Sequence, residues 1–212
     1  MAAISKEVQH RKPEYDIDPI FVNRWSPLAM SGEPLDEKDL MPLFEAARWA
    51  PSSYNNQSWR FIYAKRGTPA WERFFDLLWD GNKPWAKNAG AFVLIISKTT
   101  FDMNGKPSKT HSFDTGAAWE NLALEGSRRG LAVHPMEGFD YDKAREACRI
   151  PDGYQVEAMI AIGGRAPKET LPPIMSMAIR PPSACTRPSE IRQAAQGIMV
   201  GAAPAAPPVT LA

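Results

Sequence analysis

The stretch that decides the fold is Arg48–Phe61, which reads RWAPSSYNNQSWRF. It joins the end of a periodic apolar segment to a strand that opens at Trp59. Ala50-Pro51 forces a turn, because the residue before a proline avoids helical geometry. Small and amide side chains then follow: Ser52, Ser53, Asn55 and Gln57. Residues 51–57, which we call the elbow, could present hydroxyls and amides to a ligand, although an ordinary capped turn accounts for them equally well.

Apolar residues on both sides of the elbow are spaced as in alternating helices and strands. Upstream, a helix is expected to begin near Asp39, so that Pro42 falls in its first turn, where proline is tolerated. Downstream, Thr68 is expected to cap a helix, and Gly116–Ala118 should let a later helix approach another helix closely. The continuous apolar run 91–97 (AFVLIIS) is typical of a strand buried on both faces. Further strands are predicted at 59–64, 131–134 and 154–162, and further helices at 112–129 and 140–148. The pattern predicts one layered α/β or α+β domain on a single sheet.

Composition excludes several classes of function. The chain has 212 residues, with 25 Lys and Arg against 24 Asp and Glu, so its charge gives no argument for nucleic acid or an anionic membrane. No segment approaches the roughly 20 apolar residues of a membrane helix, and the N-terminal residues lack the apolar core of a secretory signal. His10, His111 and His134 do not cluster, so no metal site is expected. Cys148 and Cys185 lie far apart, as in a reduced cytoplasmic protein. No P-loop or dinucleotide-binding fingerprint is present.

Blocks along the chain resemble the nitroreductase family of flavin enzymes over residues 20–165. They read NRWSP (23–27), ARWAPSSYNNQSWRF (47–61), DTGAAWENLALEGSRRGL (114–131) and HPMEGFDYDKAREACRIPDGYQVEAMIAIG (134–163). The resemblance implies an α+β fold of three-layer α/β/α type, with a central, mostly antiparallel sheet flanked by helices. It also implies a homodimer with exchanged arms, two FMN molecules at its interface, and NAD(P)H as reductant.

The same resemblance implies roles for individual residues. Arg24, Trp25 and Ser26 would hold the FMN phosphate and ribityl chain, since a guanidinium can donate two parallel bonds to a phosphate. Without the resemblance, Arg24 and Ser26 could be only a solvated pair. The elbow would line the flavin, partly from the other subunit, through Pro51, Ser52, Ser53, Asn55 and Gln57. Asn82 would add an amide near the ring, although a residue that merely ends a helix is the simpler interpretation.

The segment Pro135-Met136-Glu137-Gly138 would run along the flavin ring, with the Glu137 and Gly138 N–H groups near N5 and O4. Taken alone, Glu137-Gly138 could be a simple tight turn. Arg187 is the candidate for a further phosphate contact near the C-terminus. No catalytic side chain is expected, because the flavin carries the redox chemistry and the protein orients it.

Composition and the resemblance together suggest the domain organisation, and the resemblance also shows departures. Residues 1–18 are expected to form a mobile arm, 19–166 the FMN-binding domain, 167–191 an extended arm that wraps the partner, and 192–212 a disordered Ala/Pro-rich tail. Leu28 replaces a second basic residue of the family, which removes one phosphate contact. Ser58 replaces a proline, with a small loss of turn rigidity. The tail beyond Ile191 departs altogether, as a diverged or frame-shifted segment would.

The function expected from the resemblance is that of an FMN-dependent NAD(P)H oxidoreductase with a ping-pong cycle, acting on nitroaromatics, quinones or similar electron-poor acceptors. One alternative is a specialised flavin enzyme of the same fold, such as a dehalogenase. Such relatives usually add a lid insertion, and none is obvious between Gly67 and Lys98. Another alternative is a flavin-binding protein without turnover.

Overall fold

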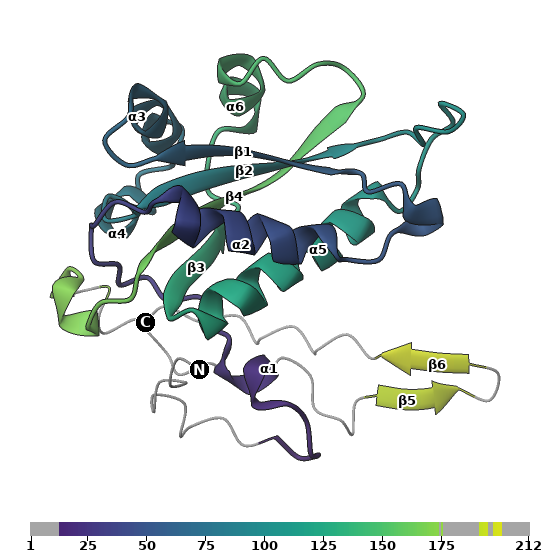
Figure 1. Ribbon diagram of the computed structural model, residues 1–212, viewed down its shortest axis with the longest axis horizontal. Coiled ribbons are helices and arrows are strands. Elements are labelled where there is room, and N and C mark those ends of the chain that lie inside the picture. Colours follow the sequence, from purple (N-terminus) through teal and green to yellow (C-terminus); the bar gives the residue numbers. More distant parts are fainter. Residues whose placement is uncertain (1–12, 174, 176–190, 195–196, 201–212) are drawn as a thin grey trace, which may run out of the picture.

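The computed structural model describes residues 13–173, Met175 and the backbone of residues 191–194 and 197–200 (Figure 1). The elements run in the order α1 Pro19–Asn23, α2 Glu37–Arg48, the 3-10 turn η1 Ser53–Asn55, β1 Trp59–Lys65, α3 Pro69–Asp76, α4 Lys83–Ala86, β2 Ala91–Lys98, α5 His111–Arg128, β3 Leu131–Met136, α6 Tyr141–Ala147, β4 Tyr154–Gly164 and the 3-10 turn η2 Lys168–Thr170. The predicted strands and longer helices are all present. The short elements α1 and α4 were not predicted.

The central sheet has four strands in the order β1-β2-β4-β3, and every neighbouring pair is antiparallel. β2 and β4 are therefore the inner strands, and β1 and β3 are the two edges. A register shift between Ile95 and Ile96 in the β2–β4 pair is the signature of a β-bulge. The α+β class with an antiparallel sheet is confirmed.

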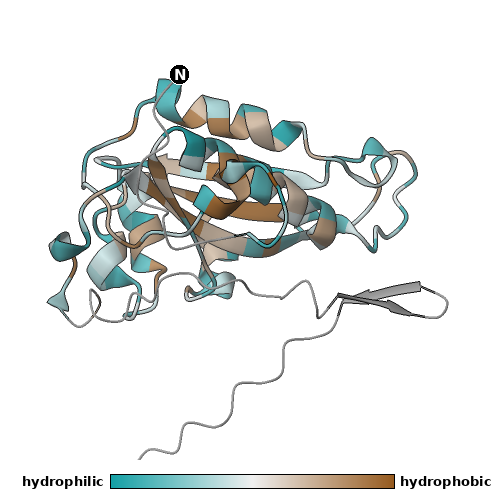
Figure 2. Ribbon diagram, turned by 90° about the horizontal axis from the view of Figure 1, so that it is seen from below, coloured by the Kyte–Doolittle hydropathy of each residue, from teal (hydrophilic) through white to brown (hydrophobic). Residues whose placement is uncertain are grey.

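Helices cover both faces of the sheet, which makes three layers (Figure 1). Ala91, Val93 and Ile95 pack with the buried residues of α2 and α5 on one face. The alternating residues Phe92, Leu94 and Ile96 pack with α3, α4 and α6 on the other face. Because both faces are covered, the run 91–97 is apolar at nearly every position, and Figure 2 shows this apolar interior between more polar helices.

Capping chemistry sets the helix starts. The Thr68 hydroxyl accepts from the Trp71 N–H at 3.3 Å, and the Asp140 carboxylate accepts from the Lys143 N–H at 3.0 Å, as the sequence predicts. The expectation for α2 was wrong. The Asp36 N–H donates to the Asp39 carboxylate at 3.0 Å, a capping-box contact that starts the helix at Glu37 and leaves Pro42 inside it.

The predicted packing of α5 on another helix is made through Ala118, which is buried against α2, and a tighter contact lies further along α5. A Cβ added at Gly116 would meet nothing within 4 Å, whereas one added at Gly126 would lie 2.4 Å from Val133 Cγ2. Gly126 is buried where α5 crosses β3. This second contact is between helix and sheet, and only glycine fits there.

Two further features concern the ends of the chain. The strands β5 Ile191–Ala194 and β6 Gly197–Val200 pair in an antiparallel hairpin, within the segment that composition predicts to be disordered. These strands were not predicted from the sequence. Across the part of the chain that the structure describes, no helix combines the length and apolar character needed to cross a membrane.

Candidate functional site

The segment that leaves α1 carries the predicted phosphate-binding residues. The Asp18 carboxylate caps α1 by accepting from the Ile20 N–H at 2.8 Å, and the chain becomes extended at Arg24. The backbone before and after this point is anchored to other elements. The Ser127 hydroxyl of α5 donates to the Asn23 carbonyl at 3.4 Å. His134 of β3 contacts the Ser26 carbonyl at 2.9 Å.

The Arg24 guanidinium is engaged in an ion pair. Its Nε lies 3.2 Å from Glu120 Oε1 of α5, and its Nη1 is 3.5 Å from the Ser26 hydroxyl. Burial raises the pKa of the Glu120 carboxyl, and the positive charge of Arg24 opposes this rise. A phosphate bound by Arg24 would therefore share the guanidinium with a partly buried carboxylate.

His134 is a residue of this region that sequence reasoning missed. A carbonyl oxygen only accepts, so His134 Nδ1 carries the proton that it donates to Ser26. Its ring packs 4.6 Å from the Trp85 ring, and burial lowers the pKa of the imidazole. The ring is thus a neutral, fixed donor that positions Ser26. Its place directly before Pro135, within the HPMEG block, was the available signal.

β3 exposes one edge of the sheet at Pro135–Gly138. The Ile162 carbonyl accepts from the Gly90 N–H on the β2 side at 2.8 Å. The backbone groups of β4 residues face β2 and β3 alternately, so those of Ile160, like those of Ile162, face β2. The backbone groups of Pro135, which is paired with Ile160, therefore face away from β4, at the open edge of the sheet. Proline is tolerated there because the missing N–H would face away from the sheet. The Met136 side chain is buried in the core instead, so only its backbone lies along the edge.

Two backbone donors follow this edge strand. Within residues 13–173, neither the Glu137 nor the Gly138 N–H donates to another protein group. The Gly138 carbonyl accepts from the Trp79 N–H and from Asn82 Nδ2, each at 3.0 Å. A Cβ on Gly138 would lie 2.6 Å from Asn82 Nδ2, so the glycine permits this contact. Asn82 makes this contact instead of capping α4 with its side chain.

The elbow adopts an unusual backbone conformation. Tyr54, Asn55 and Gln57 all have positive φ, at 52°, 52° and 49°, a region that non-glycine residues seldom adopt. The Ser52 hydroxyl accepts from the Gln57 N–H at 3.0 Å, and the Ser53 N–H donates to buried Asp114 of α5 at 3.0 Å. Pro51 is exposed at the start of the elbow. The predicted serines therefore stabilise the turn itself.

Asn56 is the second residue that sequence reasoning missed. Its Nδ2 donates to the Ser58 hydroxyl at 2.9 Å and to the Thr100 carbonyl at 3.3 Å, and its Oδ1 accepts from the Asp102 N–H at 2.9 Å. Asn56 thus ties the elbow to the loop after β2. Ser58, which replaces the proline of the family, is 1% exposed and serves as a partner in this network.

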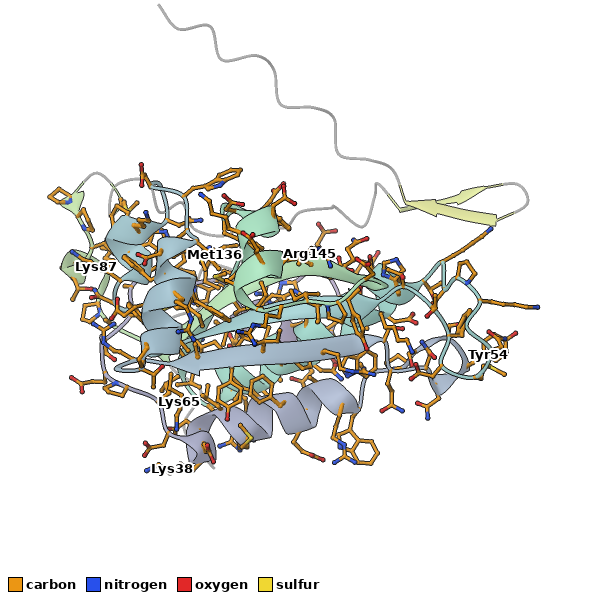
Figure 3. The ribbon with its side chains drawn as sticks, turned by 90° about the horizontal axis from the view of Figure 1, so that it is seen from above. Lys38, Tyr54, Lys65, Lys87, Met136 and Arg145 are labelled. Atoms are coloured by element: carbon orange, nitrogen blue, oxygen red, sulfur yellow. The ribbon has the colours of Figure 1, made fainter. Side chains whose placement is uncertain are left out.

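The predicted site residues fall into two groups. Ser26 is tied to β3 by His134, and Asn82 is tied to Gly138, so one group forms along the β3 edge; we call it the edge cluster (Arg24, Ser26, Asn82 and Pro135–Gly138). The elbow precedes β1, the opposite edge of the sheet. Three interstrand spacings separate these edges, about 14 Å. Figure 3 likewise shows Tyr54 at one end of the molecule and Met136 well away from it.

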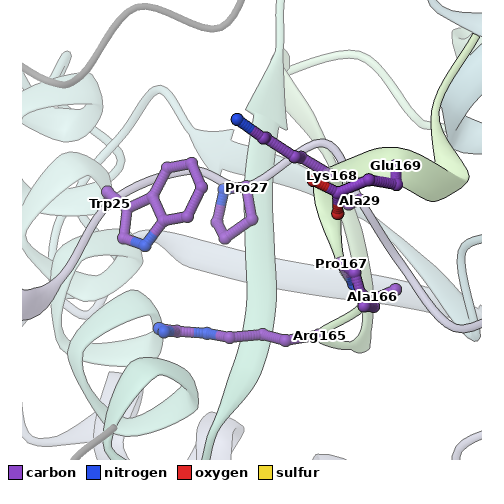
Figure 4. A pocket seen from close by; sticks show the side chains of 8 residues that line it. All are labelled: Trp25, Pro27, Ala29, Arg165, Ala166, Pro167, Lys168 and Glu169. Atoms are coloured by element: carbon purple, nitrogen blue, oxygen red, sulfur yellow. The ribbon is translucent and has the colours of Figure 1, made fainter. Parts of the chain in front are cut away.

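Trp25 faces a separate pocket of about 510 Å³ (Figure 4). Its lining comes from two segments, Trp25, Pro27 and Ala29 before α2, and residues 165–169, which follow β4. Arg187 lies outside the described residues. Among the residues that the structure describes, no group of three or more His, Cys, Asp or Glu side chains could hold a metal ion.

Comparison with known proteins gives the family. The chain matches the model of the Nitroreductase family over residues 22–84 and 68–164. A crystal structure of an "oxidoreductase containing FMN" is 43% identical, covers 79% of this chain and 86% of its own, and has a TM-score of 0.76. A Rhodopseudomonas palustris (strain TIE-1) protein named "Putative NADH dehydrogenase/NAD(P)H nitroreductase" is 28% identical over 163 residues, which are 66% of this chain and 80% of that protein. A nitroreductase family protein from Clostridium novyi NT shares the fold, with a TM-score of 0.61 and 18% identity over 74% of this chain and 89% of its own. The chain belongs to the nitroreductase family.

Proposed function

We propose that this protein is an FMN-dependent NAD(P)H oxidoreductase that reduces electron-poor acceptors such as nitroaromatics and quinones. The observation that carries the proposal is the pair of backbone donors at Glu137 and Gly138, which have no protein acceptor in residues 13–173 and follow the strand that holds Ser26 through His134. The 43% identity to an oxidoreductase that contains FMN supports the same cofactor. The NAD(P)H nitroreductase name of the Rhodopseudomonas relative supports the reductant and the acceptor class.

The donor set of the edge cluster suits FMN. Arg24 offers a guanidinium and Ser26 a hydroxyl, which match a phosphate in charge and hydrogen bonding. The Glu137 and Gly138 N–H groups offer donors without a competing protein acceptor in the described residues. Bound FMN would supply the redox chemistry, by accepting a hydride from NAD(P)H and passing electrons to the acceptor in a ping-pong cycle.

The protein's contribution is orientation. His134 fixes the Ser26 carbonyl through its Nδ1–H, and the Ser26 hydroxyl lies beside Arg24. Asn82 fixes the Gly138 carbonyl, which sets the orientation of the peptide that follows Gly138. No side chain of the edge cluster is placed as a nucleophile, and a redox reaction carried by a flavin needs none. The Glu137 side chain is exposed and acts only through its backbone.

We further propose a cytoplasmic homodimer with exchanged arms. The elbow and the edge cluster adjoin opposite edges of the sheet, which are about 14 Å apart across the four strands. One flavin could be lined by both groups most simply if the elbow came from a second copy of the chain. Residues 1–18 and 167–191 would be the arms that hold the copies together, and Arg187 would add a phosphate contact.

The test begins with the purified protein. It should be yellow, or should become yellow with added FMN, and should oxidise NADH or NADPH in the presence of a nitroaromatic or a quinone. A matched pair of variants probes the edge cluster. Gly138→Val should weaken FMN binding, because a Cβ would displace Asn82, whereas Gly116→Ala, at an exposed position of α5 where a Cβ meets no described residue within 4 Å, should not. Protein that stays colourless and ignores FMN would refute the proposal. FMN that binds but is reduced by neither nicotinamide would indicate a flavin-binding protein without turnover.

A further inference from the structure

We propose that Arg60 recognises an oxyanion of a substrate in a pocket beside the elbow. The oxyanion is either a carboxylate on the electron acceptor or a phosphate of the dinucleotide. The inference rests on the proposed function and adds a residue that selects among substrates. The pocket has a volume of about 600 Å³ and is lined by residues 54–57, Arg60, Asp102 and Met103. It therefore shares Asn55 and Gln57 with the predicted flavin site.

The Arg60 guanidinium is held in a fixed orientation. Its Nη1 donates to the Gln57 carbonyl at 2.8 Å and to the Trp59 carbonyl at 2.7 Å. A guanidinium has five N–H donors, of which Nη1 supplies two. Within the described part of the chain, Nε and Nη2 have no acceptor. This leaves a preorganised fork of donors at the pocket, the geometry that binds carboxylate or phosphate in a bidentate manner.

Two cations, Lys98 and Arg60, lie near one carboxylate, Asp102, which interacts with both of them, so the group keeps a net positive charge. Asp102 is the acidic side chain in the lining, and its carboxylate pairs with Lys98. Arg60 makes no ion pair of its own in residues 13–173. The other polar side chains in the lining are neutral amides and the Tyr54 phenol. One positive charge therefore remains for an incoming anion.

The walls of the pocket are held in place by hydrogen bonds and an aromatic contact. Asn56 joins the elbow to the Thr100–Asp102 backbone, and Tyr54 contacts Phe101 edge-on with ring centroids 5.7 Å apart. The side chains of Tyr54 and Met103 are 81% and 71% exposed, so apolar surface flanks the charged group. An aromatic ring that carries an oxyanion fits such a mixture, since specific pockets combine apolar walls with a few fixed polar groups.

The experiment compares anionic substrates with neutral counterparts that keep the same reacting group. The acceptors are 4-nitrobenzoate and the neutral 4-nitrobenzamide, and the hydride donors are NADH and the phosphate-free 1-benzyl-1,4-dihydronicotinamide. Each combination is measured with the FMN-loaded wild type, with Arg60→Gln, and with Arg73→Gln on the exposed side of α3 as a matched control. Arg60→Gln should lower kcat/KM for one anionic substrate about 3- to 10-fold, because a partly exposed ion pair is worth little more. The kcat/KM of Arg60→Gln for the neutral counterpart should be unchanged, and so should the kcat/KM values of the control variant for both substrates.

The pattern of loss identifies the source of the oxyanion. A selective loss with 4-nitrobenzoate assigns the pocket to the acceptor, and a selective loss with NADH assigns it to the dinucleotide. Calorimetric titration of the protein with benzoate, and separately with benzamide, gives a readout without turnover. If the acceptor is the source, Arg60→Gln should weaken the binding of benzoate and leave the binding of benzamide unchanged. Equal losses on charged and neutral substrates, or no loss at all, would overturn the inference while leaving the proposed function intact. Wild-type protein that oxidises neither donor would refute the proposed function, and the inference would fall with it.

Discussion

The elbow offers a sharp prediction, because two neighbouring asparagines have opposite structural roles. Asn56 has an ordinary φ of −69° and makes the hydrogen bonds to Ser58, Thr100 and Asp102. Asn55 has a φ of 52°, and its side chain makes no hydrogen bond within the described residues. Replacing each by glycine therefore separates the hydrogen-bond network from the backbone conformation.

The magnitude follows from the burial of each partner. The Ser58 hydroxyl is almost completely buried, so losing its bond to Asn56 should cost about 1–2 kcal/mol. The bonds to Thr100 and Asp102 are more exposed, and water can replace much of each. Added chain flexibility costs about another 0.5–1 kcal/mol. Asn56→Gly should thus lose about 2–3 kcal/mol, whereas Asn55→Gly should be near neutral, because glycine adopts positive φ without strain.

The assay is urea unfolding followed by far-ultraviolet circular dichroism, without added flavin, so that ligand binding does not shift the transition. The free energies are compared at an unchanged m-value, which shows that the same surface is exposed. Native-state hydrogen exchange should also show faster exchange of the Asp102 N–H in Asn56→Gly, because its acceptor is gone. Equal stability of Asn56→Gly and wild type, or a comparable loss in Asn55→Gly, would refute the reasoning.

Further predictions concern the core, the buried histidine and the phosphate end. Gly126→Ala should destabilise the protein by about 1–3 kcal/mol in the same assay, because its Cβ would lie 2.4 Å from Val133 Cγ2 in a packed core. The lowered pKa of His134 means that the unfolded chain binds a proton more readily, so stability should fall as pH drops below about 6.5, by at most about 1.4 kcal/mol per pH unit. His134→Asn keeps an N–H donor and should remove that part of the slope, measured at pH 5.5, 6.5 and 7.5. Glu120→Gln should tighten FMN binding about threefold by fluorescence quenching, because Arg24 loses its competing carboxylate.

Each of these predictions has a control or a contradicting outcome. Gly116→Ala lies in the same helix with nothing within 4 Å of the new Cβ, so it should not share the loss of Gly126→Ala. An unchanged pH slope in His134→Asn would mean that other groups carry it. Weaker flavin binding in Glu120→Gln would show that this carboxylate orients Arg24 rather than competing for it.

Much of the fold could be predicted because its signals are local. Thr68 and Asp140 cap helices through their own side chains, and the run 91–97 is apolar because both faces of β2 are covered. The start of α2 was placed two residues late because Pro42 was given more weight than the Asp36–Asp39 contact. The crossing at Gly126 could not be predicted, because it depends on Val133, whose position is set by the sheet.

The site was less accessible from sequence. Motif spacing indicated Glu137-Gly138 and Asn82, yet their contact depends on how the β3 end meets the chain before α4. Asn55, Asn56 and Gln57 look alike in sequence, and only the alternation of positive and negative φ shows that Asn56 turns inward. The separation of the elbow from the edge cluster likewise follows from the strand order, which no local pattern contains.

Pro135 has a consequence for how molecules of this protein meet in concentrated solution. An exposed sheet edge is a template on which a foreign strand can grow, and such growth is the start of aggregation. At β3 the residues whose backbone groups face away from the sheet are Leu131, Val133 and Pro135. The proline has no N–H to donate to an added strand. A strand docking there would find an interrupted ladder beyond Val133. The same residue that runs beside the proposed flavin therefore also protects this edge against misassembly.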